Sequence, residues 1–219
     1  MFRMSWCLFI LSIFVLLSCE TLSYGQNSTN ELLDKRLTVQ VKEVDLRFVL
    51  ERLALDHNIP IGLEMSSTEA YTSNLVIDVE KDTLRKILDS IIQQQSAYRW
   101  EIRDGVINFT PKRDRYEFVV AFLDLNINCF SSNKDSDEYH IRNNIFKLPE
   151  VKDLMDLKGV SPSRFPDSYT HTTPHNGVDL SISNSTIKGI LNKMARESNY
   201  KIWVVDMGGR NNDKLTISF

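Results

Sequence analysis

The sequence is poor in proline and glycine, and it carries little net charge of either sign. Its 219 residues include only 6 Pro and 8 Gly, too few for a collagen-like or linker-rich chain. The formal net charge is −3, which argues against a nucleic-acid binder because such proteins cluster Lys and Arg to neutralise phosphates. With 42% hydrophobic residues, the composition is that of a globular protein with one large core or two small ones.

Long apolar runs are also missing, apart from one at the N-terminus. Residues 7–17 are apolar except for Ser12, and they follow the single charge of Arg3. As a helix this run would rise about 16 Å, about half of a bilayer core. The pattern predicts a secretory signal peptide within residues 1–25. The alternative is a membrane anchor that stays attached.

Two cleavage sites compete at the end of this segment. Leu16-Leu-Ser-Cys19 resembles the lipobox of bacterial lipoproteins, in which the cysteine is lipidated and becomes the new N-terminus. Ser23-Tyr-Gly25 offers the small residues of an ordinary signal-peptidase site, with cleavage after Gly25. We therefore expect an exported protein, either in the periplasm or held at the outer membrane only through a lipid on Cys19. Residues 26–36 are polar and read as a tether.

Cysteine is scarce in the remaining chain. The sequence has 3 Cys, and removal of the signal leaves Cys129 without an internal disulfide partner. Cys129 alternates with Leu125 and Ile127 along a strand-like stretch. This alternation predicts a buried structural thiol, with a reactive thiol as the alternative.

Strand-like and helix-like patterns alternate through residues 37–111. Asp45 and Thr83 (or its neighbour Asp82) each precede apolar residues at helical spacing, so each can cap a helix. Asp104-Gly105 predicts a two-residue hairpin turn, because both residues accept a positive φ. Apolar and polar residues alternate in the strand-like stretches 37–41, 75–79 and 98–102.

The second half repeats part of this pattern 103 residues later. The repeat has a capped helix with one apolar face and a tryptophan at the same distance before a hairpin. Both tryptophans are expected to pack in the core or at a sheet edge rather than to stack on a ligand. The repeat-core residues are Leu84, Ile87, Leu88 and Trp100 in the first half and Ile187, Ile190, Leu191 and Trp203 in the second.

The repeat predicts an α+β fold of two small modules, residues 37–111 and 116–219. Each module would run β-α-β-β-α-β-β, with two helices packed on short sheets. The second is expected to be irregular. Residues 116–130 look strand-like, a helix near residue 138 is interrupted by Pro149, and 159–177 read as a long surface loop.

The pattern resembles the short N-terminal domain of bacterial secretins and TonB-dependent transducers. It is carried by residues 44–54, 78–88, 98–102 and 106–109, that is, by a "Leu, two more, Val-Leu" helix, a "Thr-Leu, two more, Ile-Leu" helix and a hairpin. The likeness covers residues 37–111 and, in the second module, mainly 177–219.

The resemblance implies a small periplasmic module that contacts other envelope proteins and has no catalytic residue. Family members usually continue into a membrane barrel or a secretin ring, and no such region follows Phe219. We therefore expect a free-standing or lipid-anchored relative rather than a pore.

Catalytic, cofactor-binding and metal-binding residues are not expected. His171 and His175 have the spacing of a metal pair, but Pro174 forbids the helix that such a pair needs. Asp124 to Asn128 begin like a calcium loop but lack its glycine and its final glutamate. His140 has no partner at ligand spacing. The basic run 112–115 reads as a solvated linker.

The expected function is that of a non-enzymatic protein–protein interaction module of the cell envelope. Its partners would be envelope proteins rather than nucleic acid, and contact could occur by strand addition at a sheet edge. The alternative is a periplasmic protein that binds a glycan or peptide, with the 159–177 loop and Phe165 or Tyr169 as a lid. A hydrolase with a dispersed site is a third possibility.

Overall fold

Helices and strands are mixed in an α+β fold, as the sequence predicts. The structure is a computed structural model that describes residues 30–67, 74–134, 136–163, 178–209 and 211–219. In chain order its elements are β1 (Arg36–Val44), α2 (Leu46–His57), β2 (Ile61–Glu64), β3 (Leu75–Thr83), α3 (Leu84–Gln94), β4 (Tyr98–Arg103), β5 (Val106–Pro111), α4 (Glu117–Leu123), β6 (Asn126–Ser132), α5 (Glu138–Phe146), α6 (Pro149–Lys158), β7 (Ser161–Pro162), β8 (Leu180–Thr186), α7 (Ile187–Glu197), β9 (Ile202–Gly208) and β10 (Lys214–Ser218).

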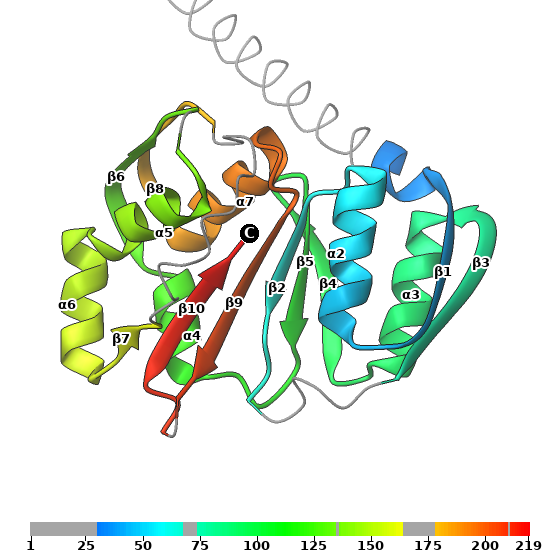
Figure 1. The fold of residues 1–219 in the computed structure, drawn as a ribbon, viewed down its shortest axis with the longest axis horizontal. Coiled ribbons are helices and arrows are strands. Elements are labelled where there is room, and N and C mark those ends of the chain that lie inside the picture. Colours follow the sequence, from blue (N-terminus) through cyan, green and yellow to red (C-terminus); the bar gives the residue numbers. More distant parts are fainter. Residues whose placement is uncertain (1–29, 68–73, 135, 164–177, 210) are drawn as a thin grey trace, which may run out of the picture.

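One six-stranded sheet runs through both halves of the chain. Its strand order is β4-β5-β2-β9-β10-β7, so the first half supplies three neighbouring strands and the second half supplies the next three. The remaining strands form two separate ribbons, β1 with β3 and β6 with β8. In Figure 1 the helices and ribbon of the first half lie on the right of the sheet, and those of the second half lie on the left.

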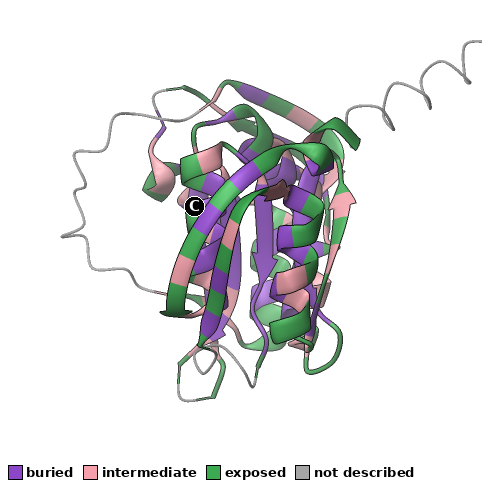
Figure 2. Ribbon diagram, turned by 90° about the vertical axis from the view of Figure 1, so that its right-hand side faces the viewer, coloured by how far each residue is buried: buried purple, intermediate pink, exposed green. Residues whose placement is uncertain are grey.

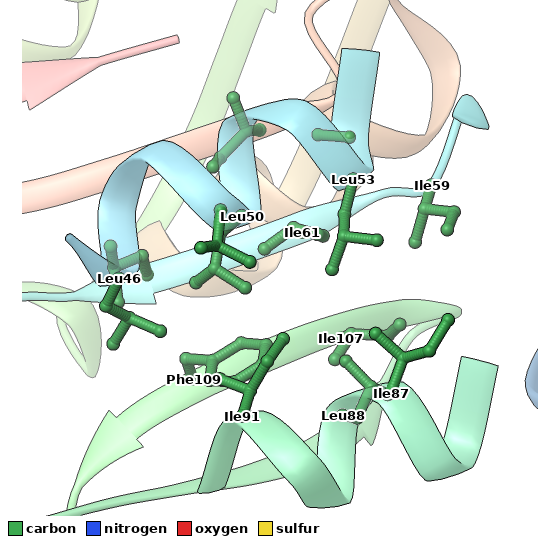
Figure 3. Close-up of a cluster of buried hydrophobic side chains, with 14 of the residues drawn as sticks. Leu46, Leu50, Leu53, Ile59, Ile61, Ile87, Leu88, Ile91, Ile107 and Phe109 are labelled. Atoms are coloured by element: carbon green, nitrogen blue, oxygen red, sulfur yellow. The ribbon is translucent and has the colours of Figure 1, made fainter. Parts of the chain in front are cut away.

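Each face of the central sheet carries its own core. On one face, α2 and α3 pack over β2 and β5, and Figure 3 shows Leu50 and Leu53 of α2 facing Ile87, Leu88 and Ile91 of α3. On the other face, helices α4 to α7 cover β9 and β10. Strand β9 therefore serves both cores, which explains its four consecutive buried residues, Ile202, Trp203, Val204 and Val205.

The two halves carry matching details as well as a matching order of elements. Thr83 and Thr186 cap α3 and α7, and each side chain accepts a hydrogen bond from the amide three residues later. Lys81 of β3 and Asn184 of β8, also 103 apart, both have a positive φ. The helical segment between β6 and β7, which takes the place of α2, is split into α5 and α6. Pro149 is the first residue of α6, where its missing N–H costs no helical hydrogen bond.

The β1–β3 ribbon is half-buried, as its period-two pattern predicts. In Figure 2, where β1 and β3 face the viewer, buried and exposed residues alternate along both strands. The predicted hairpin at Asp104-Gly105 is present, with φ values of 54° and 74°. Both values are positive, as a tight turn between twisted strands requires.

The strand expected over residues 116–130 is wrong in its first half. Residues 117–123 form α4, whose ring pair Phe118 and Phe122 stacks with centroids 6.3 Å apart. The run Phe118 to Leu123 is apolar without a clear period, and such a run fits a buried helix as well as a strand. Packing against α6 and α7 selects the helix.

Cys129 is exposed, so the predicted burial of its thiol is wrong. The buried residues of β6 are Ile127 and Phe130, which are three positions apart rather than two. A two-stranded ribbon twists strongly, so alternate residues along it do not all stay over the core.

Candidate interaction edge

The halves are joined by direct strand pairing between β2 and β9. The two strands are parallel, and Ile61, Gly62 and Leu63 lie opposite Ile202, Trp203 and Val204. The amides of Ile61 and Met65 donate to the carbonyls of Lys201 and Val205, at 2.8 and 2.9 Å. A strand from the first half of the chain thus pairs along the edge of a strand from the second half.

This joint has a direction. Strand β9 occupies the same place in the second module as β4 does in the first, because each precedes the final hairpin. Pairing thus links the β2 side of one module to the β4-type side of the other, and the two modules place their helices on opposite faces of the sheet. Such a head-to-tail contact uses two different edges, so each half keeps one edge that the joint does not use. Among the described residues, β4 and β7 are the end strands of the sheet.

A glycine makes the joint possible. The indole ring of Trp203 lies directly over Gly62, in the space that a Cβ atom at residue 62 would occupy. The ring nitrogen Nε1 donates to Oδ1 of Asn192 on α7 at 2.9 Å, and Trp203 is fully buried. Gly62 therefore leaves room for the indole ring of Trp203, and Asn192 of α7 holds that ring in place.

The same tryptophan arrangement recurs at β4 without a covering strand. Trp100 Nε1 donates to Oδ1 of Asp89 on α3 at 3.2 Å, which is the counterpart of the Trp203–Asn192 bond 103 residues later. Trp100 is only half-buried, because β4 is the end strand and no other described strand pairs with its outer edge. The predicted edge or core packing of both tryptophans is confirmed.

A buried ion pair braces the joint from the chain that connects the halves. The guanidinium of Arg115 donates from Nε and Nη2 to the two carboxylate oxygens of Glu64, at 2.6 and 2.7 Å. Glu64 is 1% exposed. The hydrogen bonds to Glu64 raise the pKa of Arg115, which outweighs the opposite effect of its partial burial.

The prediction that residues 112–115 form a solvated linker is therefore wrong for Arg115. The signal that sequence reasoning missed is Glu64, an acidic residue in a strand whose residues are all buried. A buried carboxylate needs a cation, and the nearby basic run supplies one.

Helix α7 carries a buried lysine. Lys188 on α7 is 7% exposed, and its Nζ is 3.6 Å from Oε1 of Glu101 on β4. Desolvation by burial lowers the pKa of Lys188, although the charges of Glu101 and Glu64 oppose the shift. The residue links α7 to the free strand of the sheet.

We expect Lys188→Met to flatten the alkaline pH dependence of stability. The pKa of Lys188 is lower in the folded protein than in the unfolded chain. At a pH between these two pKa values, the unfolded chain binds more protons than the folded protein, so the free energy of unfolding rises with pH. Urea unfolding at pH 8 and at about pH 10.5, the ordinary lysine pKa, should show this rise in the parent chain and a smaller rise in Lys188→Met. The exposed Lys152→Met should keep the parent's slope. Equal slopes in Lys188→Met and the parent would contradict the prediction.

Strand β4 presents unused backbone groups at its outer edge. Arg103 and Val106 flank the two-residue turn and form a hydrogen-bonded pair. In an antiparallel ladder such pairs alternate, so the main-chain groups of Arg103, Glu101 and Arg99 face β5. Trp100 and Ile102 then direct their N–H and C=O groups outward. Their counterparts on β9 are Trp203 and Val205, and the Val205 carbonyl accepts a hydrogen bond from the amide of Met65, the residue after β2.

The repeat-core residues lie where the sequence places them. All except Trp100 are buried; these are Leu84, Ile87, Leu88, Ile187, Ile190, Leu191 and Trp203. Cys19, His171 and His175 lie outside the described residues, as do the lid candidates Phe165 and Tyr169.

His140 has a carboxylate neighbour that the sequence analysis did not anticipate. Its Nδ1 is 2.7 Å from Oδ1 of Asp137, the cap residue of α5. Both side chains are solvent-exposed. Within the described ranges, His, Cys, Asp and Glu side chains nowhere gather in groups of three or more that could hold a metal ion.

A shallow hollow is lined by Glu31, Leu32, Asp34 and Lys35, all from one short segment, whereas ligand pockets combine polar groups from several elements. Across the described parts of the chain, no helix combines the length and apolar character needed to cross a bilayer.

Comparisons with protein families, with curated proteins and with solved structures give no match to this chain. The resemblance to the N-terminal domains of secretins and TonB-dependent transducers stays a prediction from residue spacing.

Proposed function

We propose that this chain is an exported cell-envelope protein that acts without catalysis, by binding other proteins through the ends of its sheet. The observation that carries the proposal is the β2–β9 joint, in which two modules of this fold bind each other by strand addition. Because the joint is head-to-tail, the same kind of edge is left open at β4. Main-chain hydrogen bonds along such an edge supply affinity, and side-chain pockets supply specificity.

Export is the second part of the proposal. It rests on the apolar run and the two competing cleavage sites within residues 1–25. Mass spectrometry of the mature N-terminus decides between the two products. A lipidated Cys19 means an anchored protein, and a free N-terminus at Gln26 means a soluble periplasmic one. An N-terminus at Met1 would contradict cleavage.

Site-specific photo-cross-linking in intact envelopes tests the binding function. A photoreactive residue is placed at Arg99 on β4, at Leu157 on α6, which precedes β7 in the chain, or at Leu55 on α2, in three separate variants that keep the N-terminal sequence. All three side chains are exposed, and α2 covers the middle of the sheet. We expect discrete covalent adducts with another envelope protein from a sheet end, and none from Leu55. Absence of a discrete adduct from every position would contradict the proposed function.

A further inference from the structure

Comparison of the β4 edge with the β9 edge, which β2 occupies, indicates which kind of strand could pair with β4. Both edges direct alternate main-chain groups outward, and both carry a tryptophan held by a helix side chain. At β9, the strand that pairs with this edge is parallel and places Gly62 opposite the tryptophan. A residue with a side chain cannot take that place, because its Cβ would overlap the ring.

The neighbouring side chains on the two edges are not alike. Ile202 and Val204 of β9 are buried beneath α2, within the first core. Their counterparts on β4 are Arg99 and Glu101, and Arg103 follows at the next alternate position. These three residues are exposed and alternate in charge. The edge therefore favours a charged partner strand rather than the apolar β2 sequence.

We propose that the β4 edge binds an extended segment of a partner protein, running parallel to β4, with a glycine opposite Trp100. The segment carries an acidic residue opposite Arg99, a basic residue opposite Glu101, an apolar residue opposite Ile102 and an acidic residue opposite Arg103. This deepens the proposed function and rests on it, since it names the edge, the strand direction and the residue types of the bound segment.

The physical basis is the same as that of the internal joint. Added main-chain hydrogen bonds satisfy the outward groups of Trp100 and Ile102, which otherwise bond to water. Glycine lets the incoming backbone cover the indole ring, as Gly62 covers Trp203. Opposite charges directly across two paired strands stabilise the pairing, and like charges across from each other destabilise it.

A designed peptide tests the proposal on the purified full chain. The probe is the capped peptide Thr-Asp-Gly-Lys-Val-Asp-Thr, and the matched control replaces its glycine with valine. At millimolar peptide, amide NMR should show shifts along β4 and at the Trp100 indole for the glycine peptide. The valine peptide should bind at least about tenfold more weakly, a difference of about 1.4 kcal/mol. Equal binding of both peptides, or shifts confined to other surfaces, would overturn the proposal.

Strand direction is read from a spin label on the peptide's N-terminus. A parallel strand places the label near Tyr98 and broadens resonances at that end of β4. Broadening at the Arg103 end instead would show antiparallel addition and overturn the parallel geometry.

A pair of variants separates edge pairing from side-chain packing. Ile102→Pro removes an outward N–H that the sheet does not use, and Ile102→Ala loses the same side-chain packing but keeps that N–H. After both are shown by NMR to be folded, Ile102→Pro should lose peptide binding and Ile102→Ala should retain it. Equal binding by the two would exclude main-chain pairing at this position.

The outcomes for the edge and for the function are distinguishable. Envelope adducts from Leu157 but none from Arg99 would contradict binding at the β4 edge and would still support the proposed binding function. Peptide binding at β4 without any envelope adduct would keep the edge chemistry but contradict the envelope function.

Discussion

Gly62→Ala is expected to lower the free energy of unfolding by about 3 kcal/mol, at the upper end of what overpacking a core costs. The added Cβ would overlap the indole of Trp203, which is buried and tied to Asn192. Neither the ring nor the β2 backbone can retreat without breaking the β2–β9 pairing. Urea unfolding followed by tryptophan fluorescence measures the loss.

Gly208→Ala is the matched control for this prediction. Gly208 also lies in a paired strand of the same sheet, and a Cβ there would meet no atom within 4 Å. Its replacement should change stability by less than about 0.5 kcal/mol. Combining Gly62→Ala with Trp203→Leu should cost less than the sum of the two single losses, because the smaller side chain vacates the space that the added Cβ needs. Similar losses in the two alanine variants would contradict the steric argument.

Arg115→Met is expected to cost about 3 kcal/mol, because it leaves the carboxylate of Glu64 buried without its counter-charge. Removing both charges in Glu64→Met/Arg115→Met should be less destabilising than Arg115→Met alone. Replacing a buried ion pair with apolar side chains of similar size removes the cost of desolvating both groups. Chemical denaturation of the two single variants and the double variant gives the coupling energy.

The neighbouring Arg113 provides the control. It lies in the same basic run but is exposed, so Arg113→Met should change stability by no more than about 0.5 kcal/mol. A double variant that is less stable than Arg115→Met would show that the ion pair does not act as described.

Local patterns predicted most of the individual elements correctly. The cap at Asp45 and the hairpin at Asp104-Gly105 occur as predicted, and of the two cap candidates for the next helix it is Thr83 that caps α3. These features depend on residues within one or two turns of one another, so the sequence alone contains the relevant contacts. The strand predicted where α4 lies is wrong for the same reason, because an apolar run without a period carries no local preference.

The candidate edge could be predicted only in part. Trp100 and Trp203 were recognised as equivalent, and packing at a sheet edge was among the expectations. Their different exposure was not foreseen, since it depends on which strand lies beside each one. Gly62 carried no signal by itself, because its role exists only when Trp203, more than a hundred residues later, packs over it.

The sequence by itself determined the α+β class, the repeated order of elements and the two apolar helix faces, because periodicity and capping act over short distances. Only the tertiary structure decided that the two modules share one sheet, that Arg115 pairs with Glu64, and that β4 remains an open end. Those outcomes depend on which distant strands meet. Strand pairing uses main-chain groups that every residue has, so the local sequence cannot specify the partner.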